Sequence, residues 1–92
     1  MKTFPVRVPF SNGLHGRPAM ELVHTAQSFE SEITIAKGAR SAAATRMIAL
    51  MTLCVKENDT VTVTVSGPDE EAAAAALERF FRQEDPPARA RM

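Results

Sequence analysis

The sequence has little of what builds cross-linked or membrane-bound proteins. Its single cysteine, Cys54, rules out an internal disulfide. No apolar run is long enough to span a bilayer. The first ten residues hold two basic residues and two prolines, where a secretory signal peptide would have an apolar stretch. We therefore expect a cytoplasmic protein in a reducing compartment.

An excess of charge of either sign is also lacking. The 92 residues include 11 basic and 11 acidic side chains, so the formal net charge is zero. Binding to nucleic acid or to an anionic membrane generally needs a basic excess, so we expect neither partner. Tryptophan and tyrosine are absent, which makes ultraviolet absorbance a poor measure of concentration. Hydrophobic residues make up 45% of the chain, which suits one small domain that we expect to be monomeric.

Strand-like and helix-like patterns alternate along the chain. Four segments have strand patterns: 4–10, 31–37, 40–43 and 60–66. Three segments have helical spacing: 16–27, 46–53 and 70–81. The order βαββαβα, with one polar face on the sheet, indicates an α+β fold, a two-layer open-faced β-sandwich. Pro5 and Pro9 have the same parity, so the first strand is expected at an edge of the sheet.

The boundaries of the predicted elements carry their own signals. Thr45 is expected to cap the helix at 46–53, and Asp69 is expected to cap the last helix. The domain is predicted to cover residues 1–84. Two prolines followed by alternating small and basic residues predict a disordered tail over 85–92.

One histidine lies where a strand pattern gives way to a helix. Asn12-Gly13 predicts a turn, and Pro18 fits only the first turn of a helix, so His15 falls at the helix start. Free backbone N–H groups and the positive end of the helix dipole meet there, which favours a phosphate. A neutral imidazole can attack phosphorus, and Arg17 supplies a fixed cation. The alternative is that His15 is only a polar cap with no chemistry.

The residues around this histidine resemble a known active-site region. Residues 12–19 read N-G-L-H-G-R-P-A and are similar to HPr, the histidine-containing phosphocarrier of the phosphoenolpyruvate:sugar phosphotransferase system. The similarity keeps the family's order and spacing through 29–35, 40–44, 47–53 and 61–71. It implies a four-stranded antiparallel sheet with three helices on one side.

The resemblance also implies roles for residues near the histidine. His15 would accept a phosphoryl group from enzyme I, on its δ nitrogen, and pass it to an acceptor of the EIIA type. Arg17 would offset the charge of that group. Gly16 stands where relatives often have Thr or Ala; it would leave the approach open and provide a helix N-terminal N–H. Such a protein is a stoichiometric relay rather than an enzyme with turnover, and no cofactor is implied.

A docking surface for partner proteins is implied as well. The short helix at 46–53 is apolar almost all round, and two turns cannot bury so many side chains against one sheet. Exposed methionines suit a surface that meets several partners. By resemblance, this helix and the first one dock enzyme I and the acceptor through Met20, His24, Gln27, Arg46, Met47, Ile48 and Met51.

The same residues allow other interpretations. A metal site would need His15, His24 and Cys54 together, but nine residues along a helix separate the histidines too far for shared ligation. Cys54 is expected to be a small buried residue. The rival function is an HPr-like module that regulates a target by binding, without phosphoryl transfer. The intact His15 and Arg17 argue against that rival.

Two features concern the place of the chain within the family. In regulated members the position of Arg46 is a serine that a dedicated kinase phosphorylates, so this control is not expected here. Ser41 and Thr45 are hydroxyls nearby, but neither is at that position. Residues 47–51 and 67–71 resemble the nitrogen-type, regulatory branch more than the sugar carriers. The residues leave the acceptor and any sugar open.

Overall fold

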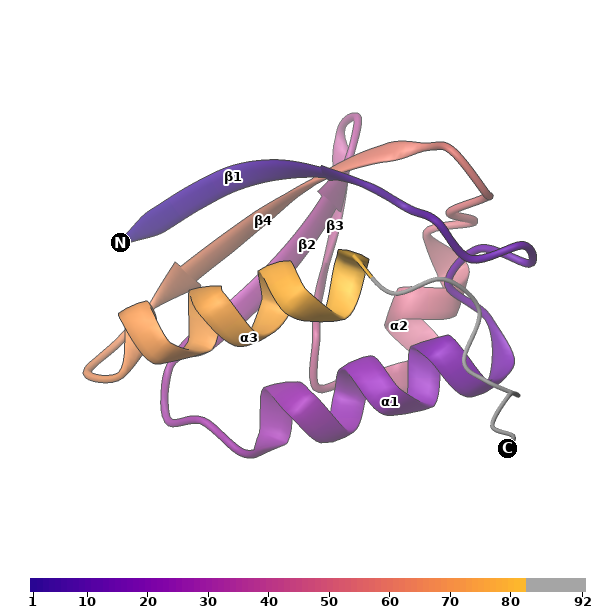
Figure 1. Cartoon of the computed structure of the whole chain (residues 1–92). Helices are drawn as coiled ribbons and strands as arrows, with labels where there is room; N and C mark the ends of the chain where they lie inside the picture. The colour runs from indigo at the N-terminus through magenta and orange to yellow at the C-terminus, as the bar shows by residue number, and fades with distance from the viewer. Residues whose placement is uncertain (83–92) are drawn as a thin grey trace.

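The computed structural model describes residues 1–82 and contains four strands and three helices (Figure 1). The chain runs through β1 (Lys2–Arg7), α1 (Gly16–Gln27), β2 (Glu32–Lys37), β3 (Arg40–Ala43), α2 (Met47–Thr52), β4 (Thr60–Ser66) and α3 (Glu70–Arg82). This confirms the βαββαβα order. The predicted tail at 85–92 lies outside the described residues.

The strands form one antiparallel sheet in the order β1-β4-β2-β3. β1 is an edge strand, as its prolines predicted, and Pro5 lies opposite Thr62 of β4. β4 is the central partner of both β1 and β2. Its valines at 61, 63 and 65 are buried, while the hydroxyl residues between them are exposed or half-buried. The period-two pattern therefore separates a core face from an outer face.

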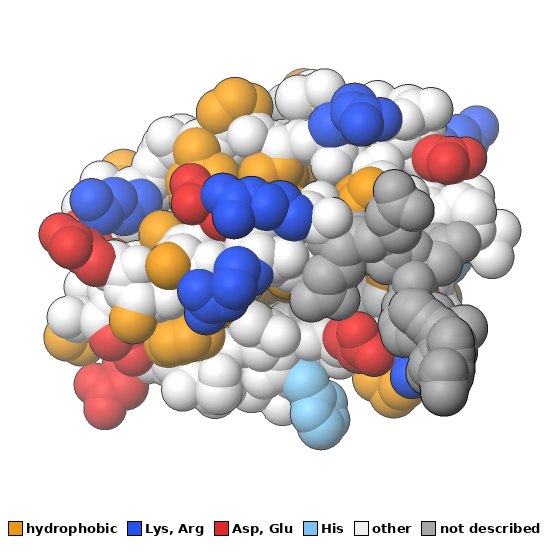
Figure 2. Space-filling model, viewed as in Figure 1, with side chains coloured by type: hydrophobic (Ala, Val, Ile, Leu, Met, Phe, Trp, Pro, Cys, Tyr) orange, Lys and Arg blue, Asp and Glu red, His pale blue; other side chains and the backbone are white. Residues whose placement is uncertain are grey.

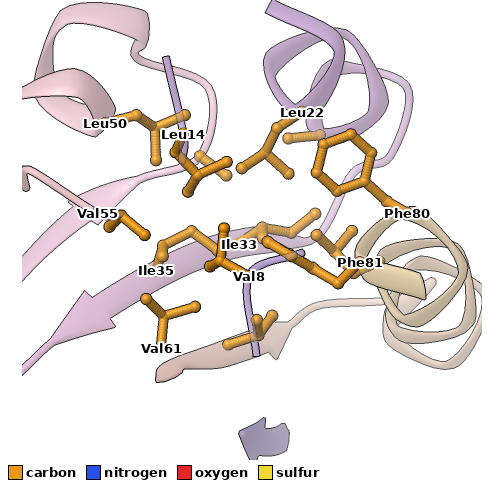
Figure 3. Packing of buried hydrophobic residues seen from close by; sticks show 14 of the residues in the cluster. Val8, Leu14, Leu22, Ile33, Ile35, Leu50, Val55, Val61, Phe80 and Phe81 are labelled. Carbon is orange, nitrogen blue, oxygen red and sulfur yellow. The ribbon is translucent and has the colours of Figure 1, made fainter. Parts of the chain in front are cut away.

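The helices cover one face of the sheet, and α1 and α3 run side by side across it (Figure 1). Between the layers, Ile33 and Ile35 of β2 pack with Leu22 of α1 and Leu50 of α2 (Figure 3). Three phenylalanines close one end of this core. The rings of Phe10 and Phe80 lie 5.2 Å apart between centroids, and those of Phe80 and Phe81 lie 5.0 Å apart at 86°. The edge-to-face pair of Phe80 and Phe81 adds to the burial energy.

The first strand is shorter at its C-terminal end than its pattern predicts. β1 begins at Lys2 and ends at Arg7, so the predicted span of 4–10 is wrong at both ends. Val8 still bonds as extended backbone, but with a loop: its N–H donates to the Asp59 carbonyl at 2.9 Å, and its carbonyl accepts from Asn58 at 2.8 Å. Phe10 is buried because it reaches the aromatic group, outside the sheet.

Of the two predicted caps, the one at Thr45 is wrong. Arg46, not Thr45, is the N-cap of α2, because the Arg46 carbonyl accepts the first helical bond, from Leu50, and its side chain makes no capping bond. Asp69 does precede α3, and its carbonyl accepts from Ala73 at 2.9 Å. Its carboxylate, however, accepts the N–H groups of Glu30 and Ser31, each at 2.9 Å, and the Ser31 hydroxyl. It therefore ties the start of α3 to the start of β2.

On the face shown in Figure 2, cationic and anionic side chains are interspersed. Among the described residues, Lys2 and Glu71 form an ion pair with the charged atoms 3.7 Å apart. No helix within residues 1–82 combines the length and apolar character needed to cross a bilayer.

Candidate functional site

His15 is the N-cap residue of α1 and is exposed to solvent. Its backbone is extended, with φ −135° and ψ 158°, and its side chain makes no capping hydrogen bond. The polar-cap interpretation requires such a bond, so the structure does not support it. The imidazole therefore makes no capping hydrogen bond to α1, although the start of α1 sets its position.

The two residues before His15 are fixed although His15 itself is exposed. Gly13 and Leu14 are buried, and the Gly13 N–H donates to the Phe10 carbonyl at 2.9 Å, which closes the predicted turn. The Leu14 N–H donates to the Val55 carbonyl at 3.2 Å. Because Leu14 has no exposed surface, the chain leading into the histidine is anchored in the core.

Gly16 begins the helix with a left-handed backbone, φ +57°. Apart from its two chain neighbours and the nearby backbone of its own helix, a β-carbon built there would meet no atom within 4 Å. No distant segment of the chain therefore crowds Gly16, and the left-handed conformation costs glycine no steric strain. The first turn of a helix leaves its N–H groups without partners in the helix. At α1 these include the amides of Gly16 and Arg17, because Pro18 has none.

Arg17 pairs with a residue that the sequence reasoning missed. Its Nε donates to Oε2 of Glu21 at 3.3 Å, an ion pair between residues four apart on one helix. Both side chains are partly exposed. The spacing of the two residues was a readable signal for this pair.

The surplus of apolar residues on α2 divides as expected between core and surface. Leu50 is fully buried, whereas 79% of Ile48 is exposed, and Met47 and Met51 are half-buried. Met20 of α1 is 50% exposed. α2 packs beside the N-terminal half of α1 (Figure 1). We call the side chains of Met20, Met47, Ile48 and Met51 the apolar surface.

The other predicted docking residues are exposed but spread out. Arg46 is the exposed N-cap residue of α2 and directly precedes Met47. His24 lines a shallow hollow on α1 with Met20, Glu21 and Thr25. Gln27 is the last residue of α1, about 16 Å along the axis from its first residue. Met20 therefore lies in the first half of α1, whereas Gln27 lies at its far end.

Two cations from the β2–β3 hairpin hold the C-terminal end of α2. The Lys37 ammonium donates to the Cys54 carbonyl at 2.7 Å, and Arg40 donates to the Thr52 carbonyl at 3.4 Å. Lys37 also pairs with Asp59 at 3.0 Å. The Lys56 backbone N–H and the Lys37 ammonium keep the pKa of the Asp59 carboxyl below its ordinary value. Nothing in the sequence signalled these contacts, because they join distant segments.

The expectation that Cys54 is buried is wrong. Cys54 is exposed and has a left-handed backbone, φ +57°. It follows the last turn of α2, where its N–H donates to the Met51 carbonyl at 3.1 Å. A left-handed residue commonly ends a helix in this way, and here it turns the side chain out of the core.

The sequence is similar to that of a known protein family. Residues 2–83 match the family model described as the HPr component phosphorylation site of the phosphotransferase system. The chain is 40% identical over 72 residues to the phosphocarrier protein HPr of Haemophilus influenzae, covering 78% of this chain and 85% of the relative. It is 37% identical over 79 residues to the HPr-like protein Crh of Halalkalibacterium halodurans, covering 86% and 94%.

A solved structure has the same fold. The crystal structure of an HPr from Thermoanaerobacter tengcongensis superposes with a TM-score of 0.86 at 33% sequence identity. The match covers 89% of this chain and 92% of that protein.

Proposed function

The chain belongs to the HPr family of phosphocarriers of the phosphotransferase system, and from this premise we propose that His15 is the residue that carries its phosphoryl group. One observation supports the assignment above the others. The imidazole of His15 lies at the N-terminus of α1, exposed and without a capping bond, while the chain before it is anchored in the core. A nucleophile must be accessible and held in place, and His15 is both.

The transfer step follows from the positions of these groups. An unprotonated ring nitrogen of His15 attacks phosphorus with its lone pair. A nitrogen–phosphorus bond forms as the bond between phosphorus and the donor breaks, and that bonding pair leaves with the donor. The amides of Gly16 and Arg17 at the helix start, together with the Arg17 guanidinium, offset the charge on the phosphoryl oxygens. Onward transfer is the same step in reverse toward an acceptor.

Partner proteins would dock on the apolar surface beside the histidine. HPr proteins exchange phosphoryl groups with enzyme I and with EIIA-type acceptors. In this chain Met20 of α1 and Ile48 of α2 offer exposed apolar contacts, and Arg46 adds a permanent cation at the start of α2. An apolar centre with a charged rim is the usual composition of a transient interface.

Phosphorylation with enzyme I and phosphoenolpyruvate tests the assignment. The wild-type protein should take up one phosphoryl group per chain, in a form that is labile in acid and stable in base. His15→Ala should take up none. His24→Ala is the matched control, because His24 is the second histidine and lies on the same helix. If His15→Ala takes up the label and His24→Ala does not, the phosphorylated residue is His24 and not His15. No label on the wild type would favour the binding module.

A further inference from the structure

Helix α1 carries one cation and one anion, and the two are paired. Within Gly16–Gln27, Arg17 is the sole basic residue and Glu21 the sole acidic residue, apart from the histidine at 24. The Arg17 Nε lies 3.3 Å from Glu21 Oε2. Their side chains are 59% and 39% exposed. The guanidinium next to the phosphorylation site thus has a carboxylate partner in the unphosphorylated protein.

This pairing engages the Nε–H of the guanidinium with a residue that lies further along the helix than His15. Glu21 is one turn further toward the C-terminus, about 6 Å along the helix axis from Arg17. His15 lies in the opposite direction, at the N-cap. The bond to Glu21 joins one nitrogen and one oxygen, so it is not bidentate. It is also exposed to solvent. An exposed pair of this kind is weak, and a stronger anion can displace it.

We propose that Glu21 is the resting partner of Arg17 and competes with the phosphoryl group on His15 for its guanidinium. The proposal rests on the proposed function, in which His15 is phosphorylated. A phosphoryl group has more negative charge and more acceptor oxygens than a carboxylate, so it takes Arg17 from Glu21. Glu21 therefore makes phosphorylation of His15, which we call loading, less favourable. It also makes transfer of the phosphoryl group to an acceptor more favourable.

Release of Glu21 also changes the surface that partners meet. Glu21 lines the hollow that contains Met20, His24 and Thr25. In the empty carrier its charge is balanced by Arg17. In the loaded carrier the carboxylate is free, so the same surface presents one more unbalanced negative charge. A partner with a cation at this place distinguishes loaded from empty carrier without touching the phosphoryl group.

The test compares Glu21→Gln with wild type in equilibrium with enzyme I, phosphoenolpyruvate and pyruvate. Glu78→Gln, an exposed residue of α3, is the matched control. The equilibrium constant for phosphorylation of His15 should rise about twofold in Glu21→Gln. That change corresponds to the free energy of an exposed ion pair at this spacing. The gain should shrink at high salt, where exposed charges are screened. Glu78→Gln should load like the wild type.

The Nε–H resonance of Arg17 reports the exchange of partners directly. It should differ between wild type and Glu21→Gln in the empty proteins and converge when both are loaded. Equal loading of the two proteins, or weaker loading of Glu21→Gln, overturns the role of Glu21. If the wild type takes no phosphoryl group on His15, the proposed function fails instead, and the two failures are distinct.

Discussion

The α-carbon of Gly13 lies against the backbone at Val55. A β-carbon on Gly13 would come within 2.8 Å of the Lys56 Cα and closer still to the Val55 carbonyl oxygen. The same carbonyl accepts the N–H of Leu14. The loop that ends at His15 is therefore seated directly on the segment that leaves α2.

Gly13→Ala should destabilise the protein by at least about 2 kcal/mol, because backbone must move and φ is +70°. Chemical denaturation measures the loss. Gly38→Ala is the control, since φ is +61° there but a β-carbon meets no atom within 4 Å. It should cost about 1 kcal/mol. Equal losses at the two glycines would mean that the close approach has no energetic role.

Cys54→Gly should stabilise the protein by about 0.5–1 kcal/mol, although it removes a side chain. Glycine adopts φ +57° without the strain that a β-carbon imposes. The midpoint of thermal unfolding should rise by several degrees. Cys54→Ser keeps the β-carbon and should bring no such gain. A glycine variant less stable than the serine variant would contradict the interpretation.

Ile48→Lys should leave stability within about 0.5 kcal/mol of wild type, because this side chain is 79% exposed. Transfer from enzyme I should weaken by about 1–2 kcal/mol, or roughly five- to thirtyfold. Leu50→Ala on the same helix is the opposite case: the side chain is buried, and the loss should be about 2–5 kcal/mol of stability. Met47→Ala should show both effects, since Met47 is half-buried. Normal transfer by Ile48→Lys would remove this residue from the docking surface.

Arg46→Asp should slow phosphorylation of His15, and more so at low salt, because it reverses a charge on the helix that we propose docks partner proteins. Arg46 is exposed and its side chain does not cap α2, so the fold should be unaffected. Arg79→Asp on the exposed side of α3 makes the same change in net charge away from α2. Transfer rates measured at several salt concentrations separate the two variants. Identical rates would show that only net charge matters.

Stability should fall in acid partly through Asp69. The Ser31 hydroxyl and the N–H groups of Glu30 and Ser31 hold the pKa of the Asp69 carboxyl below its ordinary value. A carboxyl whose pKa is lower in the folded than in the unfolded protein stabilises the fold above the unfolded pKa, about 3.9. That contribution is lost as the pH falls through the folded pKa.

Unfolding midpoints measured between neutral pH and strong acid should therefore drop less steeply for Asp69→Asn than for wild type. The variant should start from a lower midpoint at neutral pH, because the carboxylate is gone. Glu57→Gln is the control, an exposed residue in the loop before β4. A wild-type profile parallel to that of Asp69→Asn would show that Asp69 does not contribute.

Local patterns in the sequence predicted much of this structure. The bounds of α1, β3 and β4 coincide with their predicted spans, because periodicity and turn residues agree there. β1 ends early because Val8 keeps a strand pattern but bonds to the loop at 58–59. Thr45 and Cys54 were misjudged because the chain conformation at each end of α2 depends on neighbouring segments.

The candidate site was predictable to different degrees. The position of His15 at the start of α1 followed from the turn and Pro18. The pair of Arg17 and Glu21 is indicated by the spacing of four residues, but whether it forms depends on the orientation of a flexible arginine side chain. The seating of Gly13 on Val55 and the hold of Lys37 on α2 join residues far apart in sequence. Contacts of that kind have no local signature.

The pairing of the first strand with the last has a consequence for synthesis on the ribosome. β1 contacts only β4 within the sheet, and Lys2 lies opposite Val65. A nascent chain therefore holds β1 unpaired until most of the domain has emerged, and such non-local contacts slow folding. During that interval Pro5 offers no N–H for pairing with another chain. β1 therefore stays unpaired for most of synthesis, but its proline makes it a poor template for pairing with a strand of another chain.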